Sequence, residues 1–527
     1  MNAEVVFGQA KGRPSGFGLL LFGAVLVAGG VYVGSQLIGD LREVQTPGVL
    51  PYILLSVALC VALGFEFVNG FHDTANAVAT VIYTKALEAH VAVVWSGFWN
   101  FVGVLVSTGA VAFGIISLLP VELILQVGST AGFAMVFALL SAAIVWNVGT
   151  WYFGLPSSSS HTLVGSIIGV GIANQLMSPR SGTSGVDWSQ AAGVGNALLL
   201  SPIIGFVCAA LLLLIAKVLV PRRELYDEPR GATPPPFWIR ALLVLTCTGV
   251  SFAHGSNDGQ KGMGLIMLIL IGTVPTAYAL NHTVSPGQVQ EFVMSSRQAL
   301  KVLDAHIDSS VAIAEPRDEL ADYLHTREFR PARLVALRQL INDIGNELSM
   351  YQALERVPEE RIRNFRNDLY VVGEAMRLMQ TARTPAFSAE EAERLSAYRR
   401  YVDTATRFIP IWVKVAVALA LGLGTMVGWK RIVVTVGEKI GKSHLTYAQG
   451  AAAEITAMAT IGAADAFGLP VSTTHVLSSG VAGTMAANGS GVQWTTVRKL
   501  LMAWVLTLPV SVCLSGLLYW LFRTVSA

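Results

Sequence analysis

Two carboxylates stand inside long apolar stretches of this sequence, each among Gly, Asn and His residues. Asp73 lies in the segment FVNGFHDTANA, and Asp258 lies in FAHGSNDGQKG. An ionised carboxylate in the middle of a bilayer costs about 2.5 to 3.5 kcal/mol, so it requires a compensating partner. A cation held by the aspartates, by unwound backbone carbonyls and by the amide oxygens of Asn76 and Asn257 would be that partner. Capping of a half-helix by each aspartate is the alternative.

Two hydroxyl-rich segments suit an ion of the opposite charge. GLPSSSSH (154–161) and GLPVSTTH (468–475) each place a Gly-Leu-Pro break before Ser and Thr residues. This pattern predicts a new helix whose hydroxyls and free backbone N–H groups point toward one spot, which is a cradle for an anion. For one isolated copy, capping and packing by small residues would be the better interpretation. The candidate anion-binding residues are Ser157, Ser158, Ser159, Ser160, Ser472, Thr473 and Thr474.

The four segments form two pairs, which indicates a duplicated unit. The aspartate segments are 185 residues apart, from Gly70 to Gly255, and the hydroxyl segments are 314 apart, from Gly154 to Gly468. The two offsets differ by about the length of a charged insert at 284–407, so this insert splits the second copy. Each copy has five hydrophobic segments, and an odd number of crossings makes the second copy enter from the opposite face. We therefore predict an inverted repeat, as in secondary transporters whose substrate site lies where the copies meet.

Two histidines and one glutamate accompany the paired segments. His161 and His475 end the two hydroxyl runs, where a packing role competes with a supporting role at the ion site. Glu454 lies inside an apolar helix of the second copy, at the position of Leu140 in the first. Because burial favours the protonated form of a carboxyl group, Glu454 is a candidate carrier of a coupling proton.

Lys261 interrupts the match between the two aspartate segments. The first copy has Asn76 at the equivalent position, so the two copies offer different chemistry beside their aspartates. An ammonium at this place can pair with Asp258, or it can lie close to a bound anion. Lys261 is therefore a supporting residue of the predicted site, and it puts a cation site at Asp258 in question.

The composition indicates a membrane protein. Of the 527 residues 53% are hydrophobic and 13% are charged, and the mean hydropathy is +0.57. Ten or more windows of about twenty apolar residues are long enough to cross a hydrocarbon core of ~30 Å as helices. The alternation expected of a membrane barrel is absent. We predict an all-α polytopic membrane protein, an inverted-repeat secondary transporter with broken helices and a helical soluble insert.

Charge and cysteine usage narrow the function further. A net charge of +2 provides no basic surface for nucleic acid. The four cysteines lie in apolar runs without CxxC spacing, so they predict neither a disulfide framework nor a structural metal site. The insert holds 17 of the 36 Lys and Arg and 19 of the 34 Asp and Glu. Its apolar residues follow helical spacing, which predicts two or three amphipathic helices separated by Pro331, Pro358 and Pro385.

The placement of Lys and Arg residues predicts an orientation in the membrane, and all these signals together divide the chain into six parts. Lys and Arg residues such as Lys85, Lys217 and Lys430 fall on one side of the predicted crossings, which is cytoplasmic by the positive-inside rule. The N-terminus is then cytoplasmic, and the insert and the C-terminus are periplasmic. The parts are an extra transmembrane helix within 1–48, the first repeat at 49–220, a cytoplasmic linker at 221–236, the second repeat's first part at 237–283, the insert at 284–407 and the second repeat's remainder at 408–527.

The four paired segments resemble those of the inorganic phosphate transporter (PiT) family. Residues 430–450 and 461–484 are similar to the bacterial low-affinity phosphate transporters in particular, while the first helix and the insert are covered less well. The resemblance implies symport of inorganic phosphate, or of neutral metal–phosphate, driven by protons in bacterial members and by sodium in others. It also implies that Asp73 and Asp258 with their Asn neighbours bind coupling cations, and that the Ser and Thr runs bind phosphate.

We therefore expect a secondary active symporter that imports phosphate across the bacterial inner (plasma) membrane. Protons are the preferred coupling ion and sodium is the alternative; no further cofactor and no enzymatic activity are expected. The expected partners are inorganic phosphate, in free or divalent-metal-bound form, and the lipid bilayer, whereas a homodimer stays open. An anion channel would need a continuous polar lining instead of two isolated carboxylates. A Ser–His enzyme is disfavoured because the consecutive Ser160 and His161 face different directions on a helix.

Overall fold

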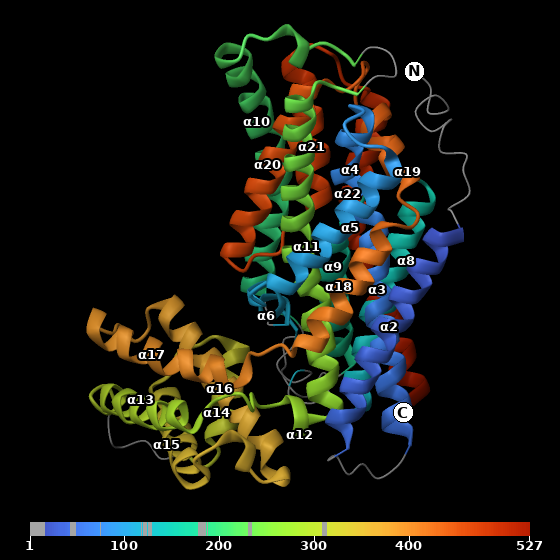
Figure 1. The fold of residues 1–527 in the computed structure, drawn as a ribbon. Coiled ribbons are helices and arrows are strands. Elements are labelled where there is room, and N and C mark those ends of the chain that lie inside the picture. Colours follow the sequence, from blue (N-terminus) through green and yellow to red (C-terminus); the bar gives the residue numbers. More distant parts are fainter. Residues whose placement is uncertain are drawn as a thin grey trace.

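The protein is a long helical bundle with a smaller helical domain at one end (Figure 1). The computed structural model describes residues 16–42, 49–73, 75–116, 118–119, 124, 129–177, 186, 188–229, 234–307 and 313–526. Regular structure in these residues is helical apart from an isolated β-bridge between Gly441 and Val492. The predicted all-α class is therefore confirmed.

The bundle contains the helices of both predicted copies and one additional helix, α2. Seven helical segments of the described chain are long and apolar enough to cross a membrane, counting α3 and α4 as one. Many of their outward side chains are apolar, as lipid contact requires. The bundle helices are α2 (Gly16–Leu41), α3 (Leu50–Asp73), α4 (Ala75–Tyr83), α5 (Ala89–Val106), α6 (Ala110–Ile116), α8 (Thr130–Tyr152), α9 (Ser159–Met177), α10 (Trp188–Leu219), α11 (Phe237–Thr273), α12 (Pro275–Tyr278), α18 (Ile411–Thr425), α19 (Lys430–Val434), α20 (Tyr447–Ala466), α21 (Thr473–Asn488) and α22 (Trp494–Ser526).

The second aspartate segment lies within one unbroken helix. α11 continues through Asp258, so the interruption and the unwound carbonyls predicted there are wrong. The glycines of this segment serve close packing instead: a Cβ at Gly255 would lie 2.2 Å from the backbone oxygen of Asn100, and one at Gly262 would lie 2.5 Å from Glu66 Oε1. Contacts with neighbouring helices thus override the low helix propensity of glycine.

The first aspartate segment lies at the junction of two helices. α3 ends at Asp73, and α4 begins at Ala75. Residue 74 lies outside the described residues, and the predicted interruption falls there. Asp73 is therefore the last described residue of α3, whereas its counterpart in the second copy lies well inside α11.

The hydroxyl segments form the turns of two matching hairpins, α8–α9 and α20–α21. Gly154 and Gly468 both have a φ of +66°, a left-handed conformation that glycine adopts without steric cost. Ser158 and Ser472 then accept a hydrogen bond at 3.1 Å from the backbone N–H three residues on, which caps the new helix in each copy. The prediction that these segments begin new helices is confirmed.

The two copies pack by crossing over each other. α9 of the first copy packs on α22 of the second, and α10 packs on α21. α5 packs on α11, and α18 packs on α3. At the α3–α18 crossing, a Cβ at Gly70 would lie 2.2 Å from the Leu421 oxygen, and one at Gly424 would lie 2.2 Å from the Phe67 oxygen. Small residues thus allow helix backbones of the two copies to approach closely, while the inverted orientation of the copies stays a prediction.

A polar layer separates two apolar clusters along the bundle. On α11, buried residues from Ile239 to Ala253 belong to one cluster and those from Met263 to Leu270 to the other. α3 contributes to one cluster and α4 to the other. The polar residues between them, including the aspartates, therefore lie inside the protein and near the middle of the bundle.

The charged insert folds into five described helices around its own core. Two or three helices were expected, and the number is wrong because Ser285 and Ser388 each begin an additional helix with a capping box. The predicted apolar positions Leu334, Leu337 and Ile341 are buried in this core. The helices are α13 (Pro286–Asp304), α14 (Pro316–Thr326), α15 (Pro331–Tyr351), α16 (Glu359–Ala382) and α17 (Ala389–Thr406).

The insert leaves and re-enters the bundle at one place. The backbone N–H of Asn281 donates to the Ala405 oxygen at 2.9 Å, and the Asn281 side chain donates to the Thr404 oxygen at 2.9 Å. Figure 1 shows the insert at the lower end of the bundle, together with the C-terminal end of α22. α4, α19 and the C-terminal end of α10 lie at the opposite end.

Candidate functional site

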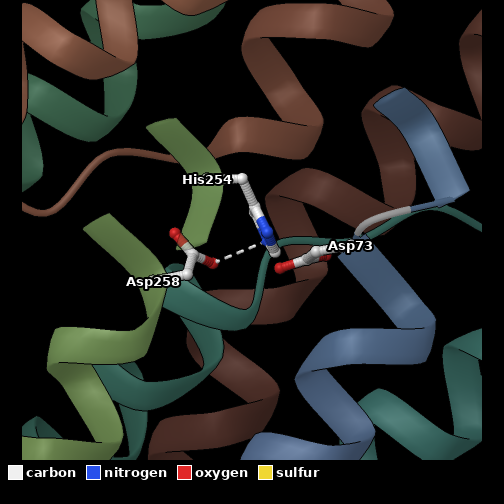
Figure 2. A group of neighbouring side chains, drawn as sticks. All are labelled: Asp73, His254 and Asp258. Atoms are coloured by element: carbon white, nitrogen blue, oxygen red, sulfur yellow. Dashed lines mark ion pairs between the residues drawn. The ribbon is translucent and has the colours of Figure 1, made fainter. Parts of the chain in front are cut away.

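Two aspartates and one histidine converge in the polar layer. Figure 2 shows Asp73 at the end of α3 facing Asp258 and His254 of α11. One ligand atom from each of the three lies within 4.8 Å of the other two. His254 Nε2 lies 3.5 Å from Asp258 Oδ2, and all three side chains are buried. Two carboxylates and an imidazole in this arrangement can bind a cation.

One hydroxyl from each copy reaches the aspartates. Ser159 Oγ, at the start of α9, donates to Asp73 Oδ2 at 2.5 Å and lies 3.3 Å from Asp258 Oδ2. Thr474 Oγ1, in the first turn of α21, donates to Asp73 Oδ1 at 2.7 Å. The structure therefore joins both hydroxyl segments and both aspartate segments in one buried cluster, as their pairing in the sequence suggested.

Lys261 connects the second aspartate to the first hydroxyl segment. Its Nζ lies 2.7 Å from Asp258 Oδ1 and donates to Ser160 Oγ at 2.5 Å. Ser160 Oγ in turn donates to the Val471 oxygen at 2.8 Å, in the turn before α21. Lys261 and Asp258 are both fully buried. Both interpretations of Lys261 from the sequence thus agree with its position, since it pairs with Asp258 and lies among the anion-binding candidates.

A chain of polar side chains leads from Asp73 to α8. His72 Nδ1 lies 3.0 Å from Asp73 Oδ1, and its Nε2 lies 3.2 Å from Thr150 Oγ1. Thr150 lies 2.9 Å from Ser157 Oγ. Ser157 therefore belongs to the polar layer through His72 and Thr150, although it does not contact an aspartate directly.

Three of the predicted anion-binding and supporting side chains have polar atoms available for a ligand. Thr473 Oγ1, His161 Nδ1 and His475 Nε2 are buried, and no hydrogen-bond partner for them lies in the described part of the chain. The two imidazole rings lie 4.5 Å apart between their centroids, at the starts of α9 and α21. Buried polar atoms normally have partners, so these atoms indicate that the site accommodates a polar ligand.

Asn257 and Asn76 do not extend the described cluster. The Asn257 side chain donates to the Leu469 oxygen at 3.1 Å and accepts from the Val471 N–H at 3.4 Å. It therefore holds the turn before α21 and does not face the aspartates, although the sequence suggested a cation ligand. Asn76 lies in α4, and its side chain is outside the described residues.

Glu454 forms a separate buried polar site. It lies in α20, fully buried, and accepts hydrogen bonds from the hydroxyls of Thr80 and Thr246. Thr246 precedes Asp258 by 12 residues on α11, which is about 18 Å at ~1.5 Å per residue. The structure therefore places this candidate proton carrier in a site separate from the aspartates.

Several polar residues of the layer were missed from the sequence. Glu66 is buried against Gly262 beside Lys261, and its carboxylate accepts from Asn69 at 3.4 Å. Asn100 Oδ1 lies 2.6 Å from His254 Nδ1. The spacing of Glu66, Asn69 and Asp73 places them on one helix face, and this signal could have revealed the first two. Asn100 has no such signal, because it comes from α5.

Next to this cluster, hydrogen bonds connect the C-terminal end of α20 to α11. Asp465 accepts hydrogen bonds at 2.6 Å from both Ser256 and Gln260. Gln260 also accepts from the Val111 N–H at 2.9 Å, which links α6 to the same place. The second hydroxyl hairpin is thus held against both copies at its turn.

A multi-pass helical bundle with a buried layer of carboxylates, hydroxyls and one ammonium is the architecture of a membrane transporter. Residues 69–515 match the family model described as the Phosphate transporter family (PHO4), and the chain belongs to this family. It is a phosphate transporter and a multi-pass protein of the bacterial inner membrane.

Similar proteins carry matching names. The chain is 42% identical over 492 residues to the low-affinity inorganic phosphate transporter PitA of Escherichia coli (strain K12), covering 89% of this chain and 96% of that one. It is 41% identical over 486 residues to PitB of the same strain, with the same coverage. A solved structure titled "The sodium-dependent phosphate transporter" shares the fold, with a TM-score of 0.50 at 19% identity, over 90% of this chain and 99% of that one. These relatives are named as transporters, and none is named as an enzyme.

Proposed function

We propose that the chain is a secondary active symporter that imports inorganic phosphate together with a coupling cation. One observation carries this proposal: the Ser159 hydroxyl touches both aspartates, and the Thr474 hydroxyl bonds to Asp73. A hydroxyl has one hydrogen, so it cannot donate to Asp73 and to an anion at the same time. When a cation or a proton neutralises the carboxylate, the two hydroxyls are released to donate to phosphate.

The phosphate site is formed by donors without an arginine. Phosphate oxygens accept hydrogen bonds, and the available donors are the Ser and Thr hydroxyls, the Lys261 ammonium and the imidazoles of His161 and His475. No Arg lies in any of the four paired segments, so phosphate forms no bidentate guanidinium pair there. Such binding is weak enough to release the ion after each cycle. Free phosphate and neutral metal–phosphate both suit this set of donors.

Protons are the preferred coupling ion. Glu454 is a buried carboxyl group whose described partners are the hydroxyls of Thr80 and Thr246, and a neutral, protonated state suits such a site. Sodium is the alternative, because the oxygens of Asp73 and Asp258 converge as ligands of a hard cation. A channel is disfavoured because apolar clusters bound the polar layer on both sides.

The distribution of charge supports an orientation. Arg222, Lys430 and Arg431 lie at the bundle end formed by α19 and the C-terminal end of α10, opposite the insert. Positive residues remain on the cytoplasmic side, so we infer that this end faces the cytoplasm, and we propose a cytoplasmic N-terminus as well. The insert and the C-terminus then face the periplasm.

The test is a counterflow assay with labelled phosphate in proteoliposomes, in which pH and Na⁺ are varied separately. Vesicles loaded with unlabelled phosphate should accumulate the label, and an imposed pH gradient should drive net uptake without Na⁺. Ser159→Ala should slow uptake by about tenfold or more, since it removes the hydroxyl shared by both aspartates. Ser166→Ala is the matched control, because Ser166 is buried in the same helix and bonds only to the Thr162 oxygen among its described contacts.

One result would contradict the proposed symport, and another would change only the coupling ion. Flux that does not saturate and does not exchange would favour a channel. Uptake that requires Na⁺ at every pH would reverse the choice of coupling ion while retaining phosphate symport.

A further inference from the structure

A cavity separate from the aspartate cluster lies where the C-terminal end of α8 meets α19. Its volume is about 670 Å³, and its walls come from α8, from α19 and from the first turn of α5. Figure 1 shows α19 at the end of the bundle opposite the insert. None of the described residues that line the cavity contacts Asp73 or Asp258, so the proposed symport does not explain it.

The charged side chains of this cavity are cationic. Lys430, Arg431 and Lys439 line it, and no Asp or Glu is among its described lining residues. All three are exposed. A cleft lined by one sign of charge raises the local concentration of ions of the opposite sign. The cavity therefore favours an anion as its ligand.

Arg431 is fixed at the wall of the cavity by two aromatic residues. Its guanidinium donates a hydrogen bond to the Tyr152 backbone oxygen. The guanidinium carbon lies 5.0 Å from the centroid of the Trp151 ring and 4.9 Å from that of the Tyr152 ring. Because a guanidinium has five N–H donors, Arg431 can keep this position and also donate to the oxygens of a phosphate group.

An exposed apolar stripe leads along α8 to the same cavity. Val145, Val148 and Tyr152 are spaced by three and four residues, so they lie on one face of α8. Their exposed fractions are 58%, 37% and 61%, and that of Phe153 in the cavity wall is 75%. On a helix that crosses a membrane, such a stripe contacts acyl chains. A surface for an acyl chain thus adjoins the cationic cavity, which favours a lipid over a soluble anion.

Both predicted copies contribute to the cavity. Trp151 Nε1, at the end of α8, donates to the Gly428 oxygen at 2.8 Å, just before α19. Thr435 Oγ1, just after α19, donates to the Gly154 oxygen at 2.8 Å. A ligand in this cavity contacts α8 and α19 at once. Its binding should therefore stabilise the folded bundle.

We propose that this cavity binds the headgroup of an anionic phospholipid. The lipid phosphate contacts Lys430, Arg431 and Lys439, and an acyl chain follows the exposed face of α8. Basic pockets between membrane helices bind lipid headgroups of this charge, and aromatic rings are enriched at the depth of the headgroups. This lipid site is distinct from the site proposed for transported phosphate, and it does not depend on the proposed symport.

The test measures lipid binding to the full-length protein in detergent. The thermal midpoint should rise with phosphatidylglycerol until the site is saturated, and it should rise less with phosphatidylcholine, whose headgroup has no net charge. In the double variant Lys430→Gln with Lys439→Gln, the apparent affinity for phosphatidylglycerol should fall by about tenfold or more, because each lysine near an anionic headgroup adds attraction.

A matched control removes two charges from the same end of the bundle. Arg222 and Arg223 follow α10, are exposed and do not line the cavity. Arg222→Gln with Arg223→Gln should change the affinity by less than about twofold, because exposed charges outside the site are screened by salt. An equal loss of affinity in both double variants would show attraction to charge alone and would overturn the site.

A soluble phosphate ester separates the two possible sources of the phosphate group. Glycerol 3-phosphate has the phosphate of the headgroup but no acyl chain, so it should raise the thermal midpoint less than phosphatidylglycerol does. An equal rise would overturn the assignment to a lipid, and so would a wild type that does not prefer phosphatidylglycerol to phosphatidylcholine.

A single variant decides the outcome if the double variant cannot be purified. Lys439→Gln should lower the apparent affinity for phosphatidylglycerol by about threefold or more. Native mass spectrometry should also show less phosphatidylglycerol retained by this variant than by wild type. Unchanged affinity together with unchanged retention would overturn the proposal.

Discussion

The two aspartate segments share a sequence pattern but differ in their surroundings. Asp73 accepts hydrogen bonds from the hydroxyls of Ser159 and Thr474, and His72 Nδ1 lies 3.0 Å from its Oδ1. Asp258 faces Lys261, whose charge is covalently attached to the same helix. A duplicated sequence therefore does not guarantee duplicated chemistry. The lysine that pairs with Asp258 has an asparagine at the equivalent position of the first copy.

The largest expected effects come from removing each carboxylate. Asp73→Asn should abolish phosphate uptake while the protein still reaches the membrane, because an amide cannot supply the negative charge that binds the coupling cation. Asp258→Asn should lower both uptake and thermal stability, since it leaves the Lys261 ammonium buried without a counterion, at a cost of about 3 to 5 kcal/mol. Uptake assays and thermal unfolding in detergent measure the two effects.

Two outcomes would remove this distinction between the aspartates. Normal uptake by Asp73→Asn would contradict its role at the cation site. An equal loss of stability in both variants would show that the ion pair with Lys261 does not distinguish Asp258 from Asp73. The double variant Asp258→Asn with Lys261→Met sharpens the comparison, because it should regain stability without regaining uptake.

A smaller effect is expected where the copies differ outside the cluster. Glu454 has Leu140 as its equivalent, so a buried carboxyl group exists in one copy only. Glu454→Gln keeps a side chain of the same shape that can bond to Thr80 and Thr246 but cannot carry a proton. Uptake driven by a pH gradient should fall by about tenfold, while counterflow at equal pH should change by less than about twofold. An unchanged response to the pH gradient would remove Glu454 from proton coupling.

The smallest expected difference between the copies concerns packing. Gly70→Ala and Gly255→Ala would each place a Cβ 2.2 Å from a backbone oxygen, that of Leu421 and that of Asn100. Each should destabilise the protein by about 1 to 3 kcal/mol, as measured by thermal unfolding. Gly64→Ala is the control on α3, because nothing lies within 4 Å of an added Cβ there. A large difference between the first two variants would show that the crossings of the two copies are not equivalent.

The architecture could be predicted largely from the sequence because membranes permit few solutions. Long apolar runs must be helical in a bilayer, since every backbone polar group needs an internal partner. The four paired segments also predicted that Asp73, Asp258, Ser159 and Thr474 belong to one site, because polar groups inside a bilayer need one another. Each of these inferences depends on the cost of unpaired polar groups in a bilayer and on the sequence pattern. None of them requires knowing which helices are in contact.

The incorrect predictions depend on contacts between distant helices. The glycines around Asp258 were interpreted as helix breakers, but they allow close approach of α5 and α3, which the sequence does not show. The Asn257 side chain was expected at the cation and instead holds the turn before α21, which is 212 residues away. Glu454 as the carrier of a coupling proton stays a prediction, and its buried site with Thr80 and Thr246 is separate from the aspartates.

The hydrogen bond between Asn281 and Ala405 has a consequence for the history of the chain. Because these two residues are neighbours, the segment between them begins and ends at adjacent points, and joining those points directly costs little loop entropy. Residues 282–404 can therefore be lengthened, replaced or lost without changing the position of any membrane helix. Diversity among relatives should accumulate in this domain, where new partners can be acquired while the membrane helices that form the transport site stay unchanged.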